Sequence, residues 1–269
     1  YRFCMQQLEH KINLIKKEYF GCSIAICEKG HKFVIGARGG SPTDPVTNGT
    51  AYVFENDKIT KLEAPDGKLG DRFGVCCKIS HDGSIIVIGA YQANSVYVFK
   101  NEKFLYKISE DAKHFGYNLD INSDGTKIVV GAFNYNNDQG KVFYYENGDL
   151  IDEFQADDTK EGDFFGRTVK LSDDENQLMI GTRNHEKVYR FDYQSIWIEK
   201  EIITNMYNPR KENIKERHGR KVFGSFLKHD NWFGYSIDIF PDGRSLVGAP
   251  RENGHGEVYL CSANFSVAR

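Results

Sequence analysis

Residues 73–90 read FGVCCKISHDGSIIVIGA, and this stretch holds the features that decide the fold. A Phe-Gly pair opens it, and the following residues alternate in polarity up to Ile79. Asp82-Gly83 then marks a tight turn, and a continuous apolar run leads to Gly89-Ala90. Two such strands joined by Asp-Gly are typical of an antiparallel β-hairpin, because glycine accepts the positive φ that the turn needs.

The same pattern occurs five times along the 269 residues. The openings are Phe20-Gly21, Phe73-Gly74, Phe115-Gly116, Phe165-Gly166 and Phe233-Gly234. The closings are Gly36-Ala37, Gly89-Ala90, Gly131-Ala132, Gly181-Thr182 and Gly248-Ala249. A third strand rich in Tyr, Val and Phe follows each closing, and four repeats add a more polar fourth strand at residues 58–62, 103–107, 149–153 and 195–198. The sequence therefore predicts an all-β fold, a β-propeller of four-stranded antiparallel blades with five repeats visible.

The first strand of each repeat has two columns of side chains. One column is apolar and is expected to face a dry core. The other is small and then mostly charged. Its charged members are expected to lean toward the central channel as a mixed-sign ring: Lys78, Asp120, Lys170 and Asp238. The opening Phe is expected to wedge between neighbouring sheets, and the following Gly to let the chain turn sharply.

We expect a single propeller domain over residues 1–269, with a long insertion at about residues 203–231. The fifth repeat supplies only three strands, and Lys11–Ile15 resembles the missing outer strand. A five-bladed ring closed by that N-terminal strand is one reading. The other is part of a larger propeller, because Tyr1-Arg2-Phe3 resembles the third strand of a further repeat.

Composition excludes several classes of function. A formal net charge of −3 gives no electrostatic case for nucleic-acid binding. No stretch approaches the roughly 20 apolar residues that span a bilayer. The six cysteines lack zinc-site spacing, the eight histidines are scattered, and no cofactor motif is present. We therefore expect no cofactor and no enzymatic activity.

With five copies in view, the chain resembles the FG-GAP repeat family, whose repeat also occurs in the integrin alpha-chain propeller. The matching stretches are residues 70–90, 115–132, 161–166 and 233–250. The resemblance implies a propeller that serves in extracellular adhesion, ligand binding or scaffolding. Many members of that family hold calcium in Asp-rich loops. The corresponding turns here are short and carry one Asp each, as in Asp82-Gly83, so calcium is not expected there.

Two segments outside the strands are candidate sites. The loop after the third closing alternates oxygen-bearing side chains at Asn134, Asn136 and Asp138, which makes it a metal candidate, although Asn and Gly also simply build loops. The insertion in the fourth repeat is either a solvated loop or a partner-docking arm. Its basic residues are Arg210, Lys211, Lys215, Arg217, Arg220 and Lys221.

The function that these patterns favour is a non-catalytic module for protein binding, adhesion or scaffolding in a larger assembly. Its expected contact surface is the set of loops that follow Gly-Ala on one rim. A glycan-binding propeller is the alternative, since Tyr91, Phe133 and Tyr135 lie in these loops, and a propeller hydrolase is a further one. Two glycosylation sequons, at Asn48 and Asn264, favour an extracellular, cell-surface or lumenal chain.

Overall fold

The computed structural model describes residues 19–41, 44–45, 47–56, 58–183, 187–193, 197–204, 215–217, 220–222, 236–239, 245–249 and 257–261. The described strands form antiparallel sheets in which the strand order follows the chain. The first sheet contains β1 (Phe20–Ile26), β2 (Lys32–Ala37), β5 (Thr50–Glu55) and β6 (Lys58–Leu62). The second contains β7 (Phe73–Ile79), β8 (Ile85–Ala90), β9 (Ser95–Lys100) and β10 (Lys103–Ser109).

The next sheets repeat this arrangement. The third contains β11 (Asn118–Ile121), β12 (Lys127–Ala132), β13 (Lys141–Glu146) and β14 (Asp149–Phe154). The fourth contains β15 (Thr168–Leu171), β16 (Gln177–Gly181), β17 (Lys187–Tyr193) and β18 (Trp197–Thr204). The fifth contains β21 (Ser236–Ile239), β22 (Ser245–Ala249) and β23 (Glu257–Cys261).

Small elements lie in the connections between these strands. Two short strand pairs are β3 (Gly40–Ser41) with β4 (Asp44–Pro45), and β19 (Lys215–Arg217) with β20 (Arg220–Val222). A 3-10 turn, η1 (Tyr91–Ala93), and an irregular turn, α1 (Tyr135–Asp138), follow two of the Gly-Ala closings.

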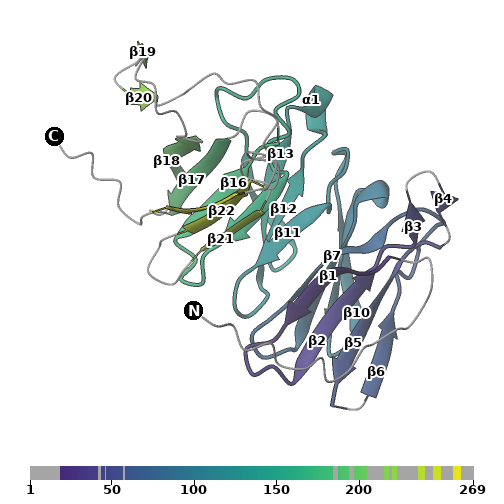
Figure 1. Ribbon diagram of the computed structural model, residues 1–269. Coiled ribbons are helices and arrows are strands. Elements are labelled where there is room, and N and C mark those ends of the chain that lie inside the picture. Colours follow the sequence, from purple (N-terminus) through teal and green to yellow (C-terminus); the bar gives the residue numbers. More distant parts are fainter. Residues whose placement is uncertain are drawn as a thin grey trace.

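The predicted four-stranded antiparallel sheets are thus confirmed for four repeats, and the fifth shows the three strands that the sequence supplies. First strands of consecutive sheets contact one another along the chain, from β1 to β7, β11, β15 and β21 (Figure 1). This arrangement is the one expected of propeller-like repeats. The two segments on which ring closure and a sixth repeat depend, Lys11–Ile15 and Tyr1-Arg2-Phe3, lie outside the described residues.

The hydrophobic cores lie between neighbouring sheets. The core between the first two sheets joins Val34 and Val53 of the first to Phe73, Cys77 and other residues of the second. Equivalent cores follow between the second and third and between the third and fourth sheets. Three opening phenylalanines, Phe73, Phe115 and Phe165, are 0% exposed, so their predicted wedging role is confirmed. Phe20, in the first sheet, is half-buried. Cys77 also belongs to the core and is 1% exposed.

The Gly-Ala closing of one sheet lies against the Phe-Gly opening of the next sheet. A Cβ atom added to Gly89, in the closing of the second sheet, would overlap the carbonyl oxygen of Gly116, in the opening of the third. The same overlap joins Gly36 to Gly74 and Gly131 to Gly166. Phe-Gly and Gly-Ala therefore recur together because two backbones approach closely at this point, which only a residue without a side chain permits.

Side chains of one first strand also bond the backbone of the next. The Cys77 N–H donates to Ser23 Oγ at 2.9 Å, and the Val169 N–H donates to Asn118 Oδ1 at 2.9 Å. First strands are edges of their sheets, so part of their backbone has no neighbouring strand to bond. The small polar column supplies the missing partners, which explains its composition.

Two expectations for the first strands need correction. Ile24 and Ile26, in the column expected to be dry, are 66% and 61% exposed, because that column packs on the preceding sheet and no described sheet precedes β1. The charged residues of the other column were expected to lean toward a channel, yet Asp120 is only 2% exposed. It is buried because lysines from both neighbouring sheets reach its carboxylate.

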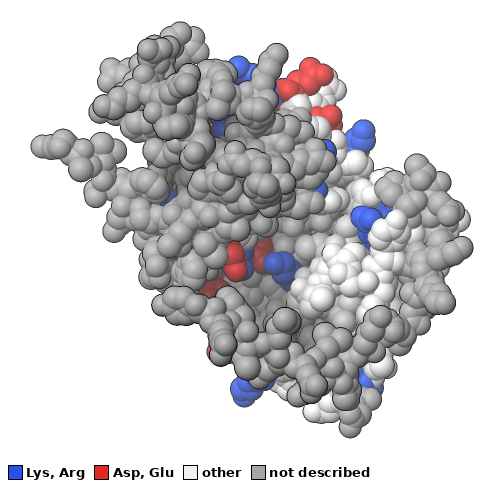
Figure 2. Space-filling model, in the orientation of Figure 1, with Lys and Arg blue, Asp and Glu red and all other residues white. Residues whose placement is uncertain are grey.

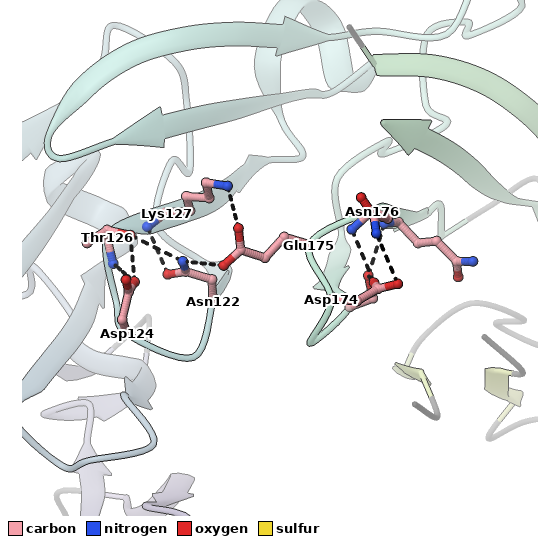
Figure 3. A network of polar contacts seen from close by, with 9 residues as sticks. Asn122, Asp124, Thr126, Lys127, Asp174, Glu175 and Asn176 are labelled. Carbon is pink, nitrogen blue, oxygen red and sulfur yellow. Dashed lines mark hydrogen bonds and ion pairs between the residues drawn. The ribbon is translucent and has the colours of Figure 1, made fainter. Parts of the chain in front are cut away.

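In the turns between first and second strands, the Asp side chain accepts hydrogen bonds from the turn's own backbone. Asp124 Oδ1 accepts the Thr126 N–H at 2.9 Å, and Asp174 Oδ1 accepts the Asn176 N–H at 3.2 Å (Figure 3). Glu175, with φ of 61°, reaches from the fourth sheet to the third, where its carboxylate accepts a hydrogen bond from Asn122 Nδ2 at 2.7 Å and pairs with Lys127 (Figure 3). Neighbouring sheets are therefore joined at this end as well.

Candidate functional site

The residue before each described Phe-Gly has an uncommon backbone conformation. Tyr19, Arg72, His114 and Phe164 have φ of 55°, 68°, 65° and 54°. Bulky side chains rarely adopt this left-handed region, and such residues cluster at functional sites. The positive φ of the glycine two residues later, as at Gly116 with 87°, completes the sharp entry into the first strand.

These turns and the Gly-Ala closings lie at the same end of the sheets, where their side chains meet. Tyr91, the first residue of η1, has ring centroids at 5.1 Å from His114 and 5.2 Å from Tyr117. Phe133, which follows β12, lies 4.8 Å from Tyr117 and 6.0 Å from Phe164. The cluster thus joins the second, third and fourth sheets.

Two arginines complete the cluster. Arg167 lies with its Cζ atom 4.2 Å from the Tyr117 ring centroid and donates a hydrogen bond to the Tyr117 hydroxyl at 2.9 Å. Arg183 lies 5.6 Å from the Phe164 ring centroid. A guanidinium over an aromatic face is attracted by the ring quadrupole. We call this set the aromatic–cation rim: Tyr91, His114, Tyr117, Phe133, Phe164, Arg167 and Arg183.

The side chains of the rim differ in how far they are exposed to solvent. Tyr91 and Phe133, both candidates from the sequence, are only 5% and 8% exposed. They offer little area to a ligand and form the floor on which other side chains rest. Arg167 and Arg183 are half-buried, and the neighbouring Gln92 is exposed. His114, Tyr117 and Phe164 are half-buried as well, so cationic and aromatic groups together form the accessible part of the rim.

The loop with the metal candidates borders the rim. His114 Nδ1 and Asn134 Oδ1 are within hydrogen-bond distance, and Asn134 Nδ2 donates to Asp138 Oδ1. Burial lowers the pKa of His114, which favours the neutral ring. Asn136 Nδ2 donates to Gln139 Oε1 at 2.7 Å, so the three candidates do not converge on one point. Among the described residues, no group of three or more His, Cys, Asp or Glu side chains is placed to hold a metal ion.

The remaining partner candidates are placed elsewhere. Tyr135 packs against the core between the second and third sheets, with Lys141 Nζ 5.2 Å from its ring centroid. The insertion contains the hairpin β19–β20, in which Lys215 pairs with Val222 and Arg217 with Arg220 (Figure 1). Lys221 lies opposite Glu216 in the same hairpin. Arg210 and Lys211 lie outside the described residues.

Ion pairs join the four charged side chains that were expected to form a mixed-sign ring. Lys78 Nζ lies 2.8 Å from Asp120, Lys170 Nζ lies 3.5 Å from the same carboxylate, and Lys170 Nζ lies 3.3 Å from Asp238. Burial alone would raise the pKa of Asp120, but the two lysines hold it below its usual value. Figure 2 shows acidic and basic side chains together near the middle of one face. These ion pairs link the first strands of four sheets.

Comparisons with known proteins agree with the repeat structure. Residues 57–99 match the family model of the FG-GAP repeat. The matched segment runs from β6 through β9, so it includes Phe73-Gly74 and Gly89-Ala90 and begins one strand before the second sheet. A search of curated proteins found no match. None of the helices in the described part of the chain is long and apolar enough to cross a membrane. Residues 57–99 are thus similar to the FG-GAP repeat, the family that the Phe-Gly openings indicate.

Proposed function

We propose that the chain is a non-catalytic β-propeller module that binds a protein partner through the aromatic–cation rim. FG-GAP repeats suggest such a binding module. In this proposal, the five described sheets are blades of one propeller domain. The observation that carries the proposal is the convergence of seven aromatic and cationic side chains from three consecutive sheets at the Gly-Ala end.

The chemistry of the rim indicates the kind of partner. Arg is enriched at protein interfaces and their energetic hot spots, where a rigid aromatic floor holds it in place. Guanidinium groups recognise carboxylates through paired hydrogen bonds. Arg167 rests on Tyr117 and Phe133, and Arg183 lies beside Phe164. The partner surface is therefore one that presents Asp or Glu side chains.

A glycan is the second candidate, favoured by the amide and carboxylate of Asn134 and Asp138 beside His114. Sugar recognition usually uses an open aromatic face, and the burial of Tyr91 and Phe133 counts against it. A glycan array screened with the whole chain and with the Asn134→Ala variant tests this candidate. Glycan binding that the variant loses would replace the protein-binding proposal.

Site-specific photo-cross-linking in cells that express the protein tests the main proposal. A photoreactive residue replaces Gln92 at the rim or, as the control, His81 in a turn at the opposite end of the same sheet. Both positions are exposed. We expect a discrete cross-linked protein from Gln92 that is absent from His81. The same products from both positions, or none from Gln92, would contradict the proposal.

A further inference from the structure

Two cysteines on neighbouring first strands lie at the boundary between the first and second sheets. Cys22, in β1, donates from Sγ to the Gly74 carbonyl oxygen at 3.3 Å, and Cys77 Sγ, in β7, lies 3.9 Å from the same oxygen. Ser23, the residue after Cys22, accepts the Cys77 N–H at its hydroxyl oxygen at 2.9 Å. The two sulfur atoms therefore approach one backbone atom from two different sheets.

The backbones of the two sheets come very close at this level. Gly36 lies opposite Ser23 in the pairing of β1 with β2. A Cβ atom added to Gly36 would overlap the Gly74 carbonyl oxygen and would lie 3.2 Å from Cys77 Sγ. A disulfide needs such an approach, since it joins cysteines whose Cα atoms are only about 4.4–6.8 Å apart.

Comparison of the repeats shows that this pair of thiols is particular to one boundary. Cys22 directly follows its Phe-Gly opening, and Cys77 is the third residue after its own opening. The residues equivalent to Cys22 in the other repeats are Val75, Tyr117, Arg167 and Tyr235, and those equivalent to Cys77 are Ile24, Leu119, Val169 and Ile237. At these two positions, a thiol stands on both sides of the first boundary and nowhere else.

The two thiols differ in their access to solvent. Cys22 is exposed, whereas Cys77 is 1% exposed, and both are free thiols in the structure. A reagent in solution therefore meets Cys22 first. Cys76, the neighbour of Cys77, is directed to the third sheet, where its Sγ lies 3.8 Å from the Leu119 carbonyl oxygen. Cys77 is thus the thiol that is placed to react with Cys22.

We propose that Cys22 and Cys77 form a disulfide bond in an oxidising environment and thereby fasten β1 to β7. The oxidant is a small-molecule disulfide such as glutathione disulfide. The Cys22 thiolate attacks one of its sulfur atoms, which forms a mixed disulfide and releases one glutathione thiolate. The Cys77 thiolate then attacks Cys22 Sγ, which closes the protein disulfide and releases the second. The released thiolates take up the two protons that the cysteines lose, so two protein thiols are oxidised and one disulfide is reduced.

The surroundings of the two thiols set the speed of this exchange. Desolvation raises the pKa of both, and at Cys22 the N–H and the charge of Arg38 partly oppose it. The thiolate is the nucleophile, so the exchange is slow at neutral pH and quickens as the pH rises.

The bond would act where the described row of sheets begins. Ile24 and Ile26 of β1 are 66% and 61% exposed, and no described sheet covers them. The second sheet is therefore the described neighbour that holds the first. A disulfide from β1 to β7 closes the whole first sheet into one covalent loop, which restricts the unfolded chain. This role does not depend on the partner binding proposed for the aromatic–cation rim.

Non-reducing peptide mass spectrometry of the whole chain tests the bond. The protein is equilibrated in glutathione buffers of rising disulfide-to-thiol ratio at about pH 8, where more thiolate is present, and free thiols are then blocked. We expect one pair of peptides joined through Cys22 and Cys77 in the wild type and in Cys76→Ser. Cys22→Ser and Cys77→Val should lack it. Valine occupies the position of Cys77 in the fourth repeat, and serine that of Cys76 in the first, so both changes suit the fold.

Thermal unfolding shows whether the bond fastens the two sheets. The oxidised wild type should have a Tm roughly 5–10 °C above that of the reduced wild type. Cys22→Ser should have the same Tm in both buffers. Free thiols at Cys22 and Cys77 in excess glutathione disulfide, Cys22 bonded only to glutathione or to a different cysteine, or a wild-type Tm that oxidation leaves unchanged would overturn the proposal.

Discussion

Replacing Gly89 by Ala tests why Phe-Gly and Gly-Ala occur together. The φ of Gly89 lies outside the left-handed region, so alanine can adopt its backbone conformation without strain. The added methyl group would nevertheless overlap the Gly116 carbonyl oxygen and lie 3.0 Å from its carbon. These are backbone atoms and cannot rotate away, so the second and third sheets must separate locally.

The size of the effect follows from that contact. Overpacking of a dense interior costs about 1–3 kcal/mol, and a rigid backbone obstacle puts Gly89→Ala at about 3 kcal/mol. For a chain of this size that loss lowers Tm by roughly 6–12 °C. The control is Gly162→Ala, where the added Cβ would have no atom within 4 Å and only the φ of +82° is unfavourable. That strain costs about 1–2 kcal/mol.

Thermal unfolding and urea denaturation of both variants, followed by circular dichroism, measure the difference. We expect Gly89→Ala to lose clearly more stability than Gly162→Ala. Equal losses would refute the close approach of the two sheets, because conformational strain alone would then account for both.

Two further predictions concern buried and turn carboxylates. Asp120→Asn removes the ion pairs to Lys78 and Lys170 and should lower the free energy of unfolding at pH 7 by about 2 kcal/mol, less than for a fully buried pair because both lysines reach water. An unchanged urea midpoint would contradict this. The difference should shrink as the pH falls below about 4, since a carboxylate with a lowered folded pKa stabilises fully above its unfolded pKa and loses this effect as the pH falls through the folded pKa. The hydrogen bonds from the Ser80 hydroxyl and the Ser84 N–H lower the pKa of Asp82 to about 2, so its contribution is present above about pH 4 and is lost as the pH falls toward 2; NMR titration of the Asp82 carboxyl should give this pKa, and an ordinary value near 3.8 would show that the turn does not hold it.

Much of the fold could be predicted because its determinants repeat. The five Phe-Gly openings and the Asp-Gly turns predicted the sheets and the inter-sheet role of Phe73 and its equivalents. The exposure of Ile24 could not be predicted, because it depends on which sheet precedes β1 rather than on the strand itself. The bulges in β10 and β14, at Leu105 and Ile151, were missed since the strands were assigned by alternation, which a bulge interrupts.

The candidate site was predicted only in outline. Tyr91 and Phe133 were found because they follow Gly-Ala in the loops of one rim. His114, Phe164 and Arg167 were missed, although a signal exists: each immediately flanks a Phe-Gly pair. Their role depends on the positive φ before Phe, which no single residue type announces, since Tyr, Arg, His and Phe all occupy that position.

The affinity of the cross-linked partner for charge-reversed variants tests the binding surface most directly. Arg183→Glu changes the aromatic–cation rim, and Lys29→Glu makes the same charge change at an exposed turn at the opposite end of the first sheet. We predict that Arg183→Glu weakens binding by at least about tenfold, as loss of an interface hot spot would, while Lys29→Glu leaves Kd unchanged. Equal effects of the two changes, or no effect of Arg183→Glu, would contradict recognition through the rim.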